Sequence, residues 1–264
     1  MRCGRSGPCR WPSACSPPPP DPVTGALPTA HSPASSLDTG EATAIARAFL
    51  PERSWGNRST YYYVRAKLGS DPLYNGVLQA LPDDGLPLLD LGCGLGLLGH
   101  VARLHGRTQP YLGVDLDAGK IDRGARAVRR AALHALDLRH LDIQQPLPRH
   151  SGHVAVLDVL HYLDAHAQAS LLQAAAARVA PGGTLVLRSP LDTGDGRDRA
   201  TRLTDRLGWL SGWMRTRPRH YPTAGALQRL LDKAGLVAEA PRRLHGRTPF
   251  NSWLLVATRP PVAR

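Results

Sequence analysis

Aromatic side chains and lysine are both scarce in this chain of 264 residues. Phe, Tyr and Trp make up 5% of the sequence, so Leu, Val and Ala must form most of the core, which the hydrophobic content of 42% allows. No apolar run approaches the roughly 20 residues that span a bilayer, and the N-terminus has no apolar stretch of the secretory type. We therefore expect a cytoplasmic protein with no membrane span.

Cysteine is also rare, and its placement excludes two common uses. Cys3, Cys9 and Cys15 lie close to the N-terminus, at spacings that do not match paired zinc ligands. A disulfide framework is not expected in a chain of this size without a secretory signal. The fourth cysteine, Cys93, lies in a glycine-rich segment and is interpreted as a small buried residue. The sequence predicts no metal site.

Acidic residues are outnumbered by basic ones, 21 to 33, which gives a formal net charge of +12. All the basic residues except Lys67, Lys120 and Lys233 are arginine. One interpretation is a GC-rich coding bias that raises the arginine content without a functional demand. The other is a negatively charged partner, such as nucleic acid, a phosphorylated substrate or an acidic carrier protein.

The chain divides into three parts by composition. Residues 1–37 are rich in Pro and Ser and show no hydrophobic period, so we expect a disordered tail. Residues 38–82 have helical patterns and are predicted to form an N-terminal helical cap. The main domain is expected over 83–264, with an Arg-rich insertion at 189–222. The cap helices are predicted over residues 42–50, 59–68 and 71–81, with Asp71 as N-cap and Pro72 as first helical residue.

Strand and helix patterns alternate through the central part of the chain. This order predicts an α/β fold, with a Rossmann-like, mostly parallel seven-stranded sheet, helices on both faces and an antiparallel last strand. The strands are expected at 86–91, 111–115, 136–141, 153–157, 184–188, 236–240 and 253–258, and the helices at 96–105, 117–132, 164–179 and 223–234.

A glycine-rich segment at residues 88–99 separates the first predicted strand from the helix that follows it. Gly92, Gly94 and Gly96 allow a sharp turn and close approach of a ligand to the backbone, and the helix N-terminus beyond offers N–H groups. Asp115 ends the next strand, where a carboxylate can accept both hydroxyl groups of a ribose. The segment also fits the G-x-G-x-x-G pattern of dinucleotide-binding domains, so by itself it is compatible with NAD.

Three further features favour another cofactor. Asp90 precedes the glycines, where a carboxylate suits the amino group of a methionine moiety better than a pyrophosphate. Helical segments precede the first strand, whereas a nicotinamide domain usually begins at that strand. The chain also ends in a strand pair after Pro181-Gly182-Gly183, and not in a second βαβ half.

The segment from Asp90 to Gly96 resembles motif I of class I S-adenosylmethionine-dependent methyltransferases. The resemblance covers about residues 60–258 and implies S-adenosylmethionine as the cofactor. It implies that Asp115 binds the adenosyl ribose, and that the acidic residue after the third strand lies near the adenine. Residues 157–162 resemble the motif after the fourth strand. The implied cofactor-binding residues are Asp90, Gly92, Cys93, Gly94, Gly96, Asp115, Leu116, Asp142, Ile143 and Asp158.

A narrower resemblance is to methyltransferases encoded beside aryl-polyene and xanthomonadin-type pigment genes. It rests on residues 61–67, Asp71-Pro72, residues 157–162 and Thr248-Pro249-Phe250. Those pathways build aryl chains on acyl carrier proteins. The resemblance implies a small-molecule or carrier-bound aryl or acyl acceptor, and an acidic carrier protein would suit the excess of arginine.

Methyl transfer needs a general base only when the acceptor must lose a proton. The candidate catalytic residues are His161, after the fourth strand, and Arg188, which ends the fifth strand and should pair with an acid or an anionic ligand. Tyr61, Tyr62 and Tyr63 are candidates for a lid, although at most two of them can point inward.

Two alternative functions stay open. One is an RNA methyltransferase, although the chain has no Asn/Asp-Pro-Pro-Tyr/Phe block after the fourth strand and no known RNA-binding module. The other, less favoured, is an NAD(P)-binding oxidoreductase. Nothing in the sequence identifies the acceptor atom.

Overall fold

The structure is a computed structural model that describes residues 34–53, 55–194, 218–246 and 251–262. These residues belong to one compact unit, residues 33–264. Three segments named in the sequence analysis lie outside the described residues: the tail up to residue 33, most of the Arg-rich insertion and the Thr248-Pro249-Phe250 segment. In the part of the chain that is described, no helix is both long and apolar enough to cross a membrane.

Three helices precede the sheet, as the sequence predicts. They are α1 (Thr39–Arg47), α2 (Ser59–Ser70) and α3 (Leu73–Ala80). Asp38 and Glu41 form a reciprocal capping box that fixes the start of α1. Helix α3 starts one residue later than expected, because Pro72 occupies the capping position while Asp71 Oδ1 accepts a hydrogen bond from the Leu73 amide at 3.0 Å.

The packed part of the chain begins before residue 38, where the sequence analysis set the boundary of the cap. Leu37 is buried, and its amide donates a hydrogen bond to the carbonyl of Leu68 at 3.1 Å. Leu37 therefore lies against α2, while the Ser35 carbonyl accepts a hydrogen bond from Asn75 of α3. The end of the predicted tail is part of the described structure.

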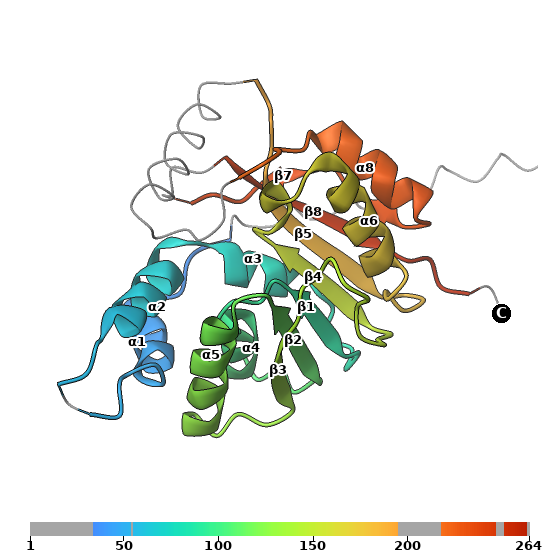
Figure 1. The fold of residues 1–264 in the computed structure, drawn as a ribbon. Helices are drawn as coiled ribbons and strands as arrows, with labels where there is room; N and C mark the ends of the chain where they lie inside the picture. Colours follow the sequence, from blue (N-terminus) through green and yellow to red (C-terminus); the bar gives the residue numbers. More distant parts are fainter. Residues whose placement is uncertain (1–33, 54, 195–217, 247–250, 263–264) are drawn as a thin grey trace, which may run out of the picture. The chain divides into compact units, whose positions relative to one another are not determined.

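Eight strands of the described chain form one sheet, in the order β3-β2-β1-β4-β5-β8-β6, with β7 also paired to β8 (Figure 1). The first five are parallel to one another, and β8 runs antiparallel to β5. This confirms the α/β fold with an antiparallel last strand. The strands are β1 (Leu88–Leu91), β2 (Tyr111–Asp115), β3 (Leu136–His140), β4 (His153–Leu157), β5 (Thr184–Pro190), β6 (Val237–Ala238), β7 (Arg242–Arg243) and β8 (Ser252–Thr258).

Side chains that cap helices mark the crossover connections between the parallel strands. Asp117, Asp164 and Thr223 each accept a hydrogen bond from a backbone amide three residues further on. A short 3-10 turn at Leu160–Tyr162 follows β4. The capped helices are α5 (Ala118–Arg130), α6 (Ala165–Ala176) and α8 (Ala224–Lys233), while α4 (Leu97–Leu104) begins directly at the glycine loop.

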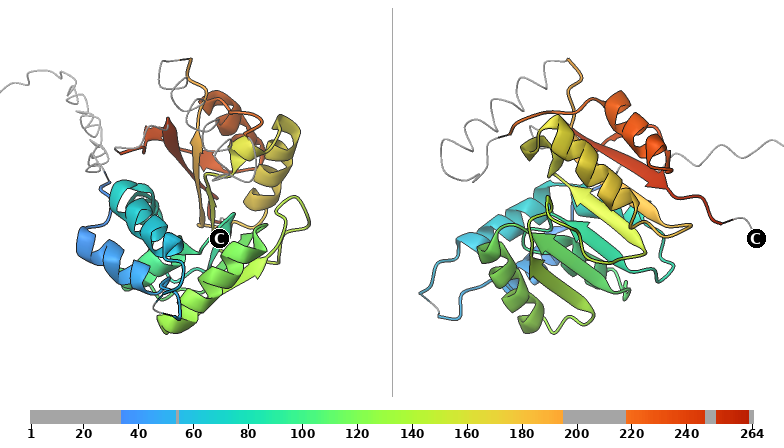
Figure 2. Two further views of the ribbon diagram at one scale, coloured as in Figure 1. Left: turned by 60° about the vertical axis from the view of Figure 1, so that its left-hand side comes forward. Right: turned by 45° about the vertical axis from the view of Figure 1, so that its right-hand side comes forward.

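Helices lie on both faces of the sheet (Figure 2). Alternation along the strands divides the buried side chains between two cores, one on each face. Leu88 belongs to the core that contains side chains of α1 to α5, and its neighbour Leu89 belongs to the core under α6 and α8. Helices on both faces make a parallel sheet stable, because each strand is then buried on both sides.

The sheet order places a topological switch point between β1 and β4. From β1 the chain proceeds to β2 and β3 on one side, and then returns to β4 and β5 on the other. Loops after β1 and β4 therefore diverge at the carboxyl edge of the sheet. Open α/β sheets bind their ligands in this crevice.

Candidate functional site

The loop after β1 turns through three glycines in the left-handed region of backbone conformation. Gly92, Gly94 and Gly96 have φ angles of 81°, 57° and 73°. A Cβ on Gly92 would overlap the Val159 side chain, and one on Gly96 would lie 2.8 Å from Leu138 Cδ2. At Gly94 the same Cβ would meet only Lys120 Cδ, at 3.9 Å. Gly94 therefore faces space that protein atoms leave open, where a ligand can approach the backbone.

Asp115 holds this loop in place from the end of β2. Its Oδ2 accepts a hydrogen bond from the Gly94 amide at 2.8 Å, and its Oδ1 accepts one from the Asp117 amide at 2.8 Å. Each carboxylate oxygen can accept further hydrogen bonds. Asp115 is therefore attached directly to the glycine loop. Its contact with a ribose stays a prediction.

Asp90 is enclosed inside the sheet beneath the loop. Tyr111 donates a hydrogen bond to its Oδ2 at 2.6 Å, while Oδ1 is buried with no hydrogen-bond partner in the described structure. Burial raises the pKa of the Asp90 carboxyl to about 7, against the opposing effect of the Tyr111 hydrogen bond and with a smaller contribution from the charge of Asp115. Its predicted contact with a methionine amino group stays a prediction.

The remaining predicted cofactor residues lie along the same carboxyl edge. The Cys93 side chain lies close to Gly113 of β2, and burial, followed by the charges of Asp90 and Asp115, raises the pKa of its thiol. Leu116 is 60% exposed directly after β2. After β3, Asp142 accepts a hydrogen bond from the Gln144 amide at 3.0 Å, and Ile143 packs against the core under α6.

His161 lies in the 3-10 turn after β4, buried between two aromatic rings. Its ring stacks on Tyr221 at 6.2 Å with 7° between the planes, and lies 4.1 Å from the ring of Tyr162. Burial lowers the pKa of His161 to about 4, so the imidazole is neutral at pH 7. In the described structure its Nδ1 is buried without a hydrogen-bond partner.

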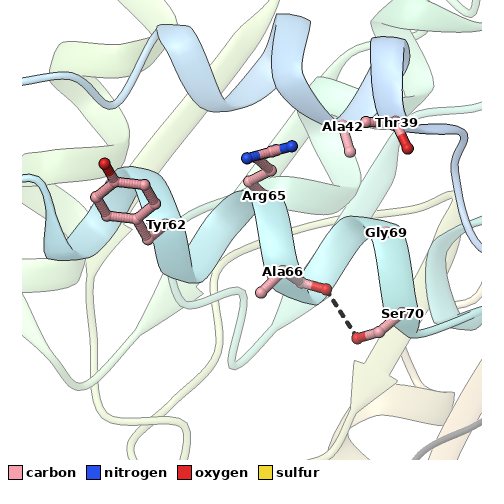
Figure 3. Close-up of a pocket in the computed structure, with 7 residues that line it drawn as sticks. All are labelled: Thr39, Ala42, Tyr62, Arg65, Ala66, Gly69 and Ser70. Carbon is pink, nitrogen blue, oxygen red and sulfur yellow. Dashed lines mark hydrogen bonds between the residues drawn. The ribbon is translucent and has the colours of Figure 1, made fainter.

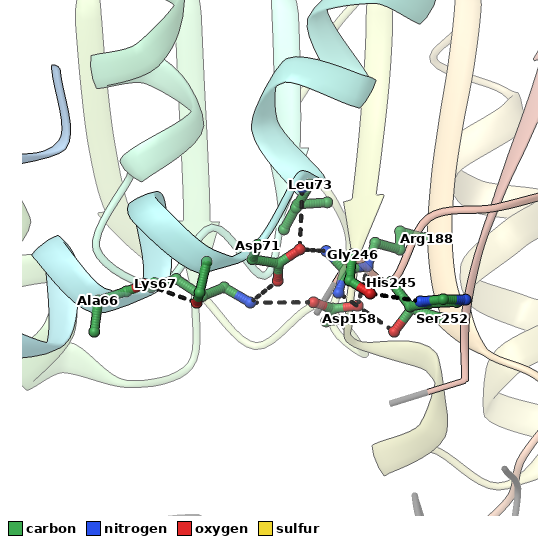
Figure 4. Close-up of polar contacts among 10 residues, drawn as sticks. Ala66, Lys67, Asp71, Leu73, Asp158, Arg188, His245, Gly246 and Ser252 are labelled. Carbon is green, nitrogen blue, oxygen red and sulfur yellow. Dashed lines mark hydrogen bonds and ion pairs between the residues drawn. The ribbon is translucent and has the colours of Figure 1, made fainter. Parts of the chain in front are cut away.

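Arg188 at the end of β5 belongs to a ring of four alternating charges, which we call the charge ring (Figure 4). Its Nη1 donates to Asp71 Oδ1 at 2.6 Å, and its Nε lies 3.3 Å from Asp158 Oδ1. Lys67 of α2 closes the ring, with its Nζ 2.6 Å from Asp71 Oδ2 and 3.7 Å from Asp158 Oδ2. The Arg188–Asp158 contact is an ion pair and not an aligned hydrogen bond, since neither atom has a hydrogen-bond partner among the described residues.

The charge ring favours the ionised forms of Asp71, Lys67 and Arg188 although these side chains are largely enclosed. Burial favours the neutral form of Asp71, but Arg188 and Lys67 outweigh this effect and lower the pKa of its carboxyl. Burial likewise opposes the charge of Lys67 and Arg188, and the carboxylates of Asp158 and Asp71 raise the pKa of both. The sequence predicts an acidic residue or an anionic ligand as the partner of Arg188, and the structure shows two acids, Asp71 and Asp158.

Two members of the charge ring were not among the predicted site residues. From the sequence, Asp71 is interpreted as a helix cap, and both Lys67 and Asp71 belong to the segments that carry the narrower resemblance, without an assigned role. The Lys67–Asp71 spacing of four residues, at the end of a helix, was the one signal that the sequence offered for this pair. Among the three tyrosines at the start of α2, Tyr61 packs against the core while Tyr62 and Tyr63 are exposed.

A separate hollow lies on the surface between α1 and α2 (Figure 3). It has a cavity volume of about 520 Å³, and its lining contains the candidate lid residue Tyr62 but none of the predicted cofactor-binding or catalytic residues. The lining residues are Thr39, Ala42, Tyr62, Arg65, Ala66, Gly69 and Ser70.

Comparison with known families decides between the two interpretations of the glycine loop. Residues 64–240 match the family model described as a methyltransferase domain, which covers the loop, Asp115 and the charge ring. The chain belongs to this methyltransferase family. The match favours S-adenosylmethionine over a nicotinamide cofactor as the ligand of the glycine loop.

Individual relatives are more distant. A ribosomal protein L11 methyltransferase from Janthinobacterium sp. (strain Marseille) is 35% identical over 123 residues, which are 44% of this chain and 36% of that protein. The chain thus spans about a third of the length of this relative.

Two solved structures share the fold of this methyltransferase. An O-methyltransferase family protein from Burkholderia thailandensis has a TM-score of 0.57 at 20% identity, covering 73% of this chain and 56% of that one. Magnesium protoporphyrin IX methyltransferase from Synechocystis PCC 6803, with bound SAH, has a TM-score of 0.58 at 19% identity, covering 84% and 95%. At these identities the likeness concerns the fold.

Proposed function

We infer that this chain transfers a methyl group from S-adenosylmethionine to a small-molecule or carrier-bound aryl or acyl acceptor. The observation that carries the cofactor assignment is the junction of Gly94 and Asp115. The loop leaves open space at Gly94, and the carboxylate that holds the loop is the group that we assign to the ribose hydroxyls. The bound SAH of the Synechocystis relative agrees with this choice.

The residues present fit such a cofactor. Asp115 would accept the ribose hydroxyl groups, Asp142 and Ile143 would lie beside the adenine, and the backbone of the glycine loop would follow the methionine portion. The cofactor supplies an electrophilic methyl group on a sulfonium centre. The protein aligns the acceptor with that methyl group and excludes water.

The acceptor side is formed after β4 and β5. His161 is neutral at pH 7 because burial lowers its pKa to about 4, so it is in the form that accepts a proton. Arg188 is 1% exposed and engaged by two carboxylates, so we assign it a positioning role and not a contact with the acceptor. The two rings beside His161 give an apolar, aromatic wall that suits an aryl group.

The net charge of +12 supports an acidic carrier protein as the molecule that presents the acceptor. The name of the Janthinobacterium relative points to a protein substrate, but its match covers 36% of that protein and does not extend the substrate to this chain. RNA remains the competing polyanion.

A transfer assay with S-adenosylmethionine labelled in its methyl group separates these acceptors. Three substrates would be offered in parallel: a free hydroxyaryl acid, the same acid attached to an acyl carrier protein, and total RNA. We expect label in the aryl compound, with the carrier-bound form preferred. Label in RNA alone would replace the proposal with the RNA alternative.

A further inference from the structure

One edge of the charge ring, between Lys67 and Asp158, is wider than the other three, and we call it the open edge. The Lys67–Asp71 and Asp71–Arg188 edges measure 2.6 Å each, and the Arg188–Asp158 edge measures 3.3 Å. The fourth edge, between Lys67 Nζ and Asp158 Oδ2, measures 3.7 Å, which is too long for a hydrogen bond.

The open edge is also the exposed edge. The side chains of Asp71 and Arg188 are 2% and 1% exposed, whereas those of Lys67 and Asp158 are 25% and 29% exposed. Among the described residues, Lys67 Nζ has a single partner at hydrogen-bond distance, so an ammonium with three donors has capacity left. Asp158 Oδ2 faces it with an acceptor oxygen.

Asp158 is held in this position at a conformational cost. Its φ angle of 56° is in the left-handed region, which non-glycine residues seldom adopt. Its amide donates a hydrogen bond to the Arg188 carbonyl at 2.9 Å. The next residue, Val159, occupies the space over Gly92 that a Cβ would need. The open edge therefore lies beside the cofactor loop, and strained residues of this kind are common at functional sites.

We propose that the gap between Lys67 and Asp158 binds a hydroxyl group of the methyl acceptor, which makes the reaction an O-methylation. Lys67 Nζ donates a hydrogen bond to the acceptor oxygen, and Asp158 Oδ2 accepts one from its O–H group. The proposal rests on the proposed methyl-transfer function. It moves Asp158 from the cofactor side of the site to the acceptor side, and it makes Asp158, and not His161, the group that takes the proton.

The proposed reaction at this gap is a displacement at the methyl carbon, coupled to a proton transfer. The acceptor O–H bond breaks and its proton passes to Asp158, while the acceptor oxygen forms a bond to the methyl carbon. The carbon–sulfur bond breaks and its electron pair stays on sulfur, which becomes a neutral thioether. Lys67 stabilises the negative charge that develops on oxygen. Asp71 and Arg188 are positioning residues that hold Lys67 and Asp158 apart at the required distance.

A matched pair of probes tests the gap in protein loaded with S-adenosylhomocysteine. 4-Nitrophenol carries the hydroxyl group, and 4-nitroanisole is the same molecule with that hydroxyl methylated. We expect wild-type protein to bind 4-nitrophenol about tenfold more tightly, the difference that one charge-assisted hydrogen bond provides. Lys67→Met and Asp158→Asn should each abolish this preference. Asn is chosen because it tolerates the left-handed conformation.

Arg65→Met is the matched control, since Arg65 is an exposed residue of the same helix outside the charge ring, and its preference should equal that of wild type. Equal binding of both probes by wild type, or an unchanged preference in both variants, would overturn the proposal. Absence of saturable 4-nitrophenol binding would do so too. Affinity for S-adenosylhomocysteine is measured on every sample. If wild-type protein does not bind it, the proposed methyl-transfer function itself is wrong. If the variants bind it as wild type does, they are folded.

Discussion

Both carboxylate oxygens of Asp71 are engaged at 2.6 Å, one by Lys67 and one by Arg188. Lys67 belongs to the helical cap and Arg188 to the end of β5, so this single carboxylate joins the cap to the sheet. A residue that lies between helices α2 and α3 thereby fixes the position of a charge at the carboxyl edge of the sheet.

Replacement of Asp71 should be strongly destabilising. Asp71→Ala leaves the buried Arg188 guanidinium with less compensation, and removal of one partner from a buried pair costs about 3–5 kcal/mol. The free energy of unfolding, measured in urea, should fall by this amount. Asp137→Ala is the control, because Asp137 pairs with Arg139 on the exposed surface and should lose less than about 1 kcal/mol. Similar losses in the two variants would mean that the buried pair does not connect the cap to the sheet.

The buried carboxyl of Asp90 should make stability depend on pH. Its pKa is raised to about 7, above the ordinary value of 3.8, so the folded state binds a proton more tightly than the unfolded state. Its contribution is therefore fully present below pH 4 and is lost as the pH rises toward 7, by at most about 1.4 kcal/mol per pH unit.

Urea unfolding of wild type and Asp90→Asn at pH 5, 6, 7 and 8 measures this effect. The difference in unfolding free energy between the two proteins should shift in favour of the Asn variant from pH 5 to pH 7, and then level off. A difference that is constant over this range would show that Asp90 is ionised throughout, contrary to its enclosed position.

Gly94 and Gly85 provide a matched pair for the open space at the loop. Both have positive φ angles, 57° and 80°, and a Cβ on either meets no atom closer than 3.9 Å. Alanine at either position should cost about 1 kcal/mol of stability through backbone strain. Only Gly94→Ala should also weaken cofactor binding measured by calorimetry, because only its methyl group enters the ligand space. Equal cofactor affinities in the two variants would show that Gly94 is not part of the cofactor-binding site.

Much of the fold followed from local patterns in the sequence. The bounds of β2 and β4 agree with the predicted ranges, and Asp117, Asp164 and Thr223 cap the helices that follow them. Apolar alternation and capping act within a few residues, so a single sequence contains that information. The boundary of the cap was less accurate, because the burial of Leu37 depends on packing against α2.

The charge ring could not be predicted in the same way. Asp71 and Arg188 are 117 residues apart, and their pairing depends on how the cap lies across the carboxyl ends of β4 and β5. The sequence showed that Arg188 needed a partner, but not which acid would provide it. Likewise, the glycine loop indicated a nucleotide-like ligand, whereas the enclosure of Asp90 depends on Tyr111 of the neighbouring strand.

Calorimetric titration of the purified protein with S-adenosylhomocysteine, compared with NAD⁺, tests the central claim most directly. We predict micromolar binding of S-adenosylhomocysteine, no binding of NAD⁺, and a loss of about a hundredfold or more in Asp115→Ala, because the ribose hydroxyl groups lose a charged acceptor. Asp122→Ala, an exposed acid on α5, should bind as wild type does. Binding of NAD⁺ but not of S-adenosylhomocysteine, or undiminished binding by Asp115→Ala, would contradict the account.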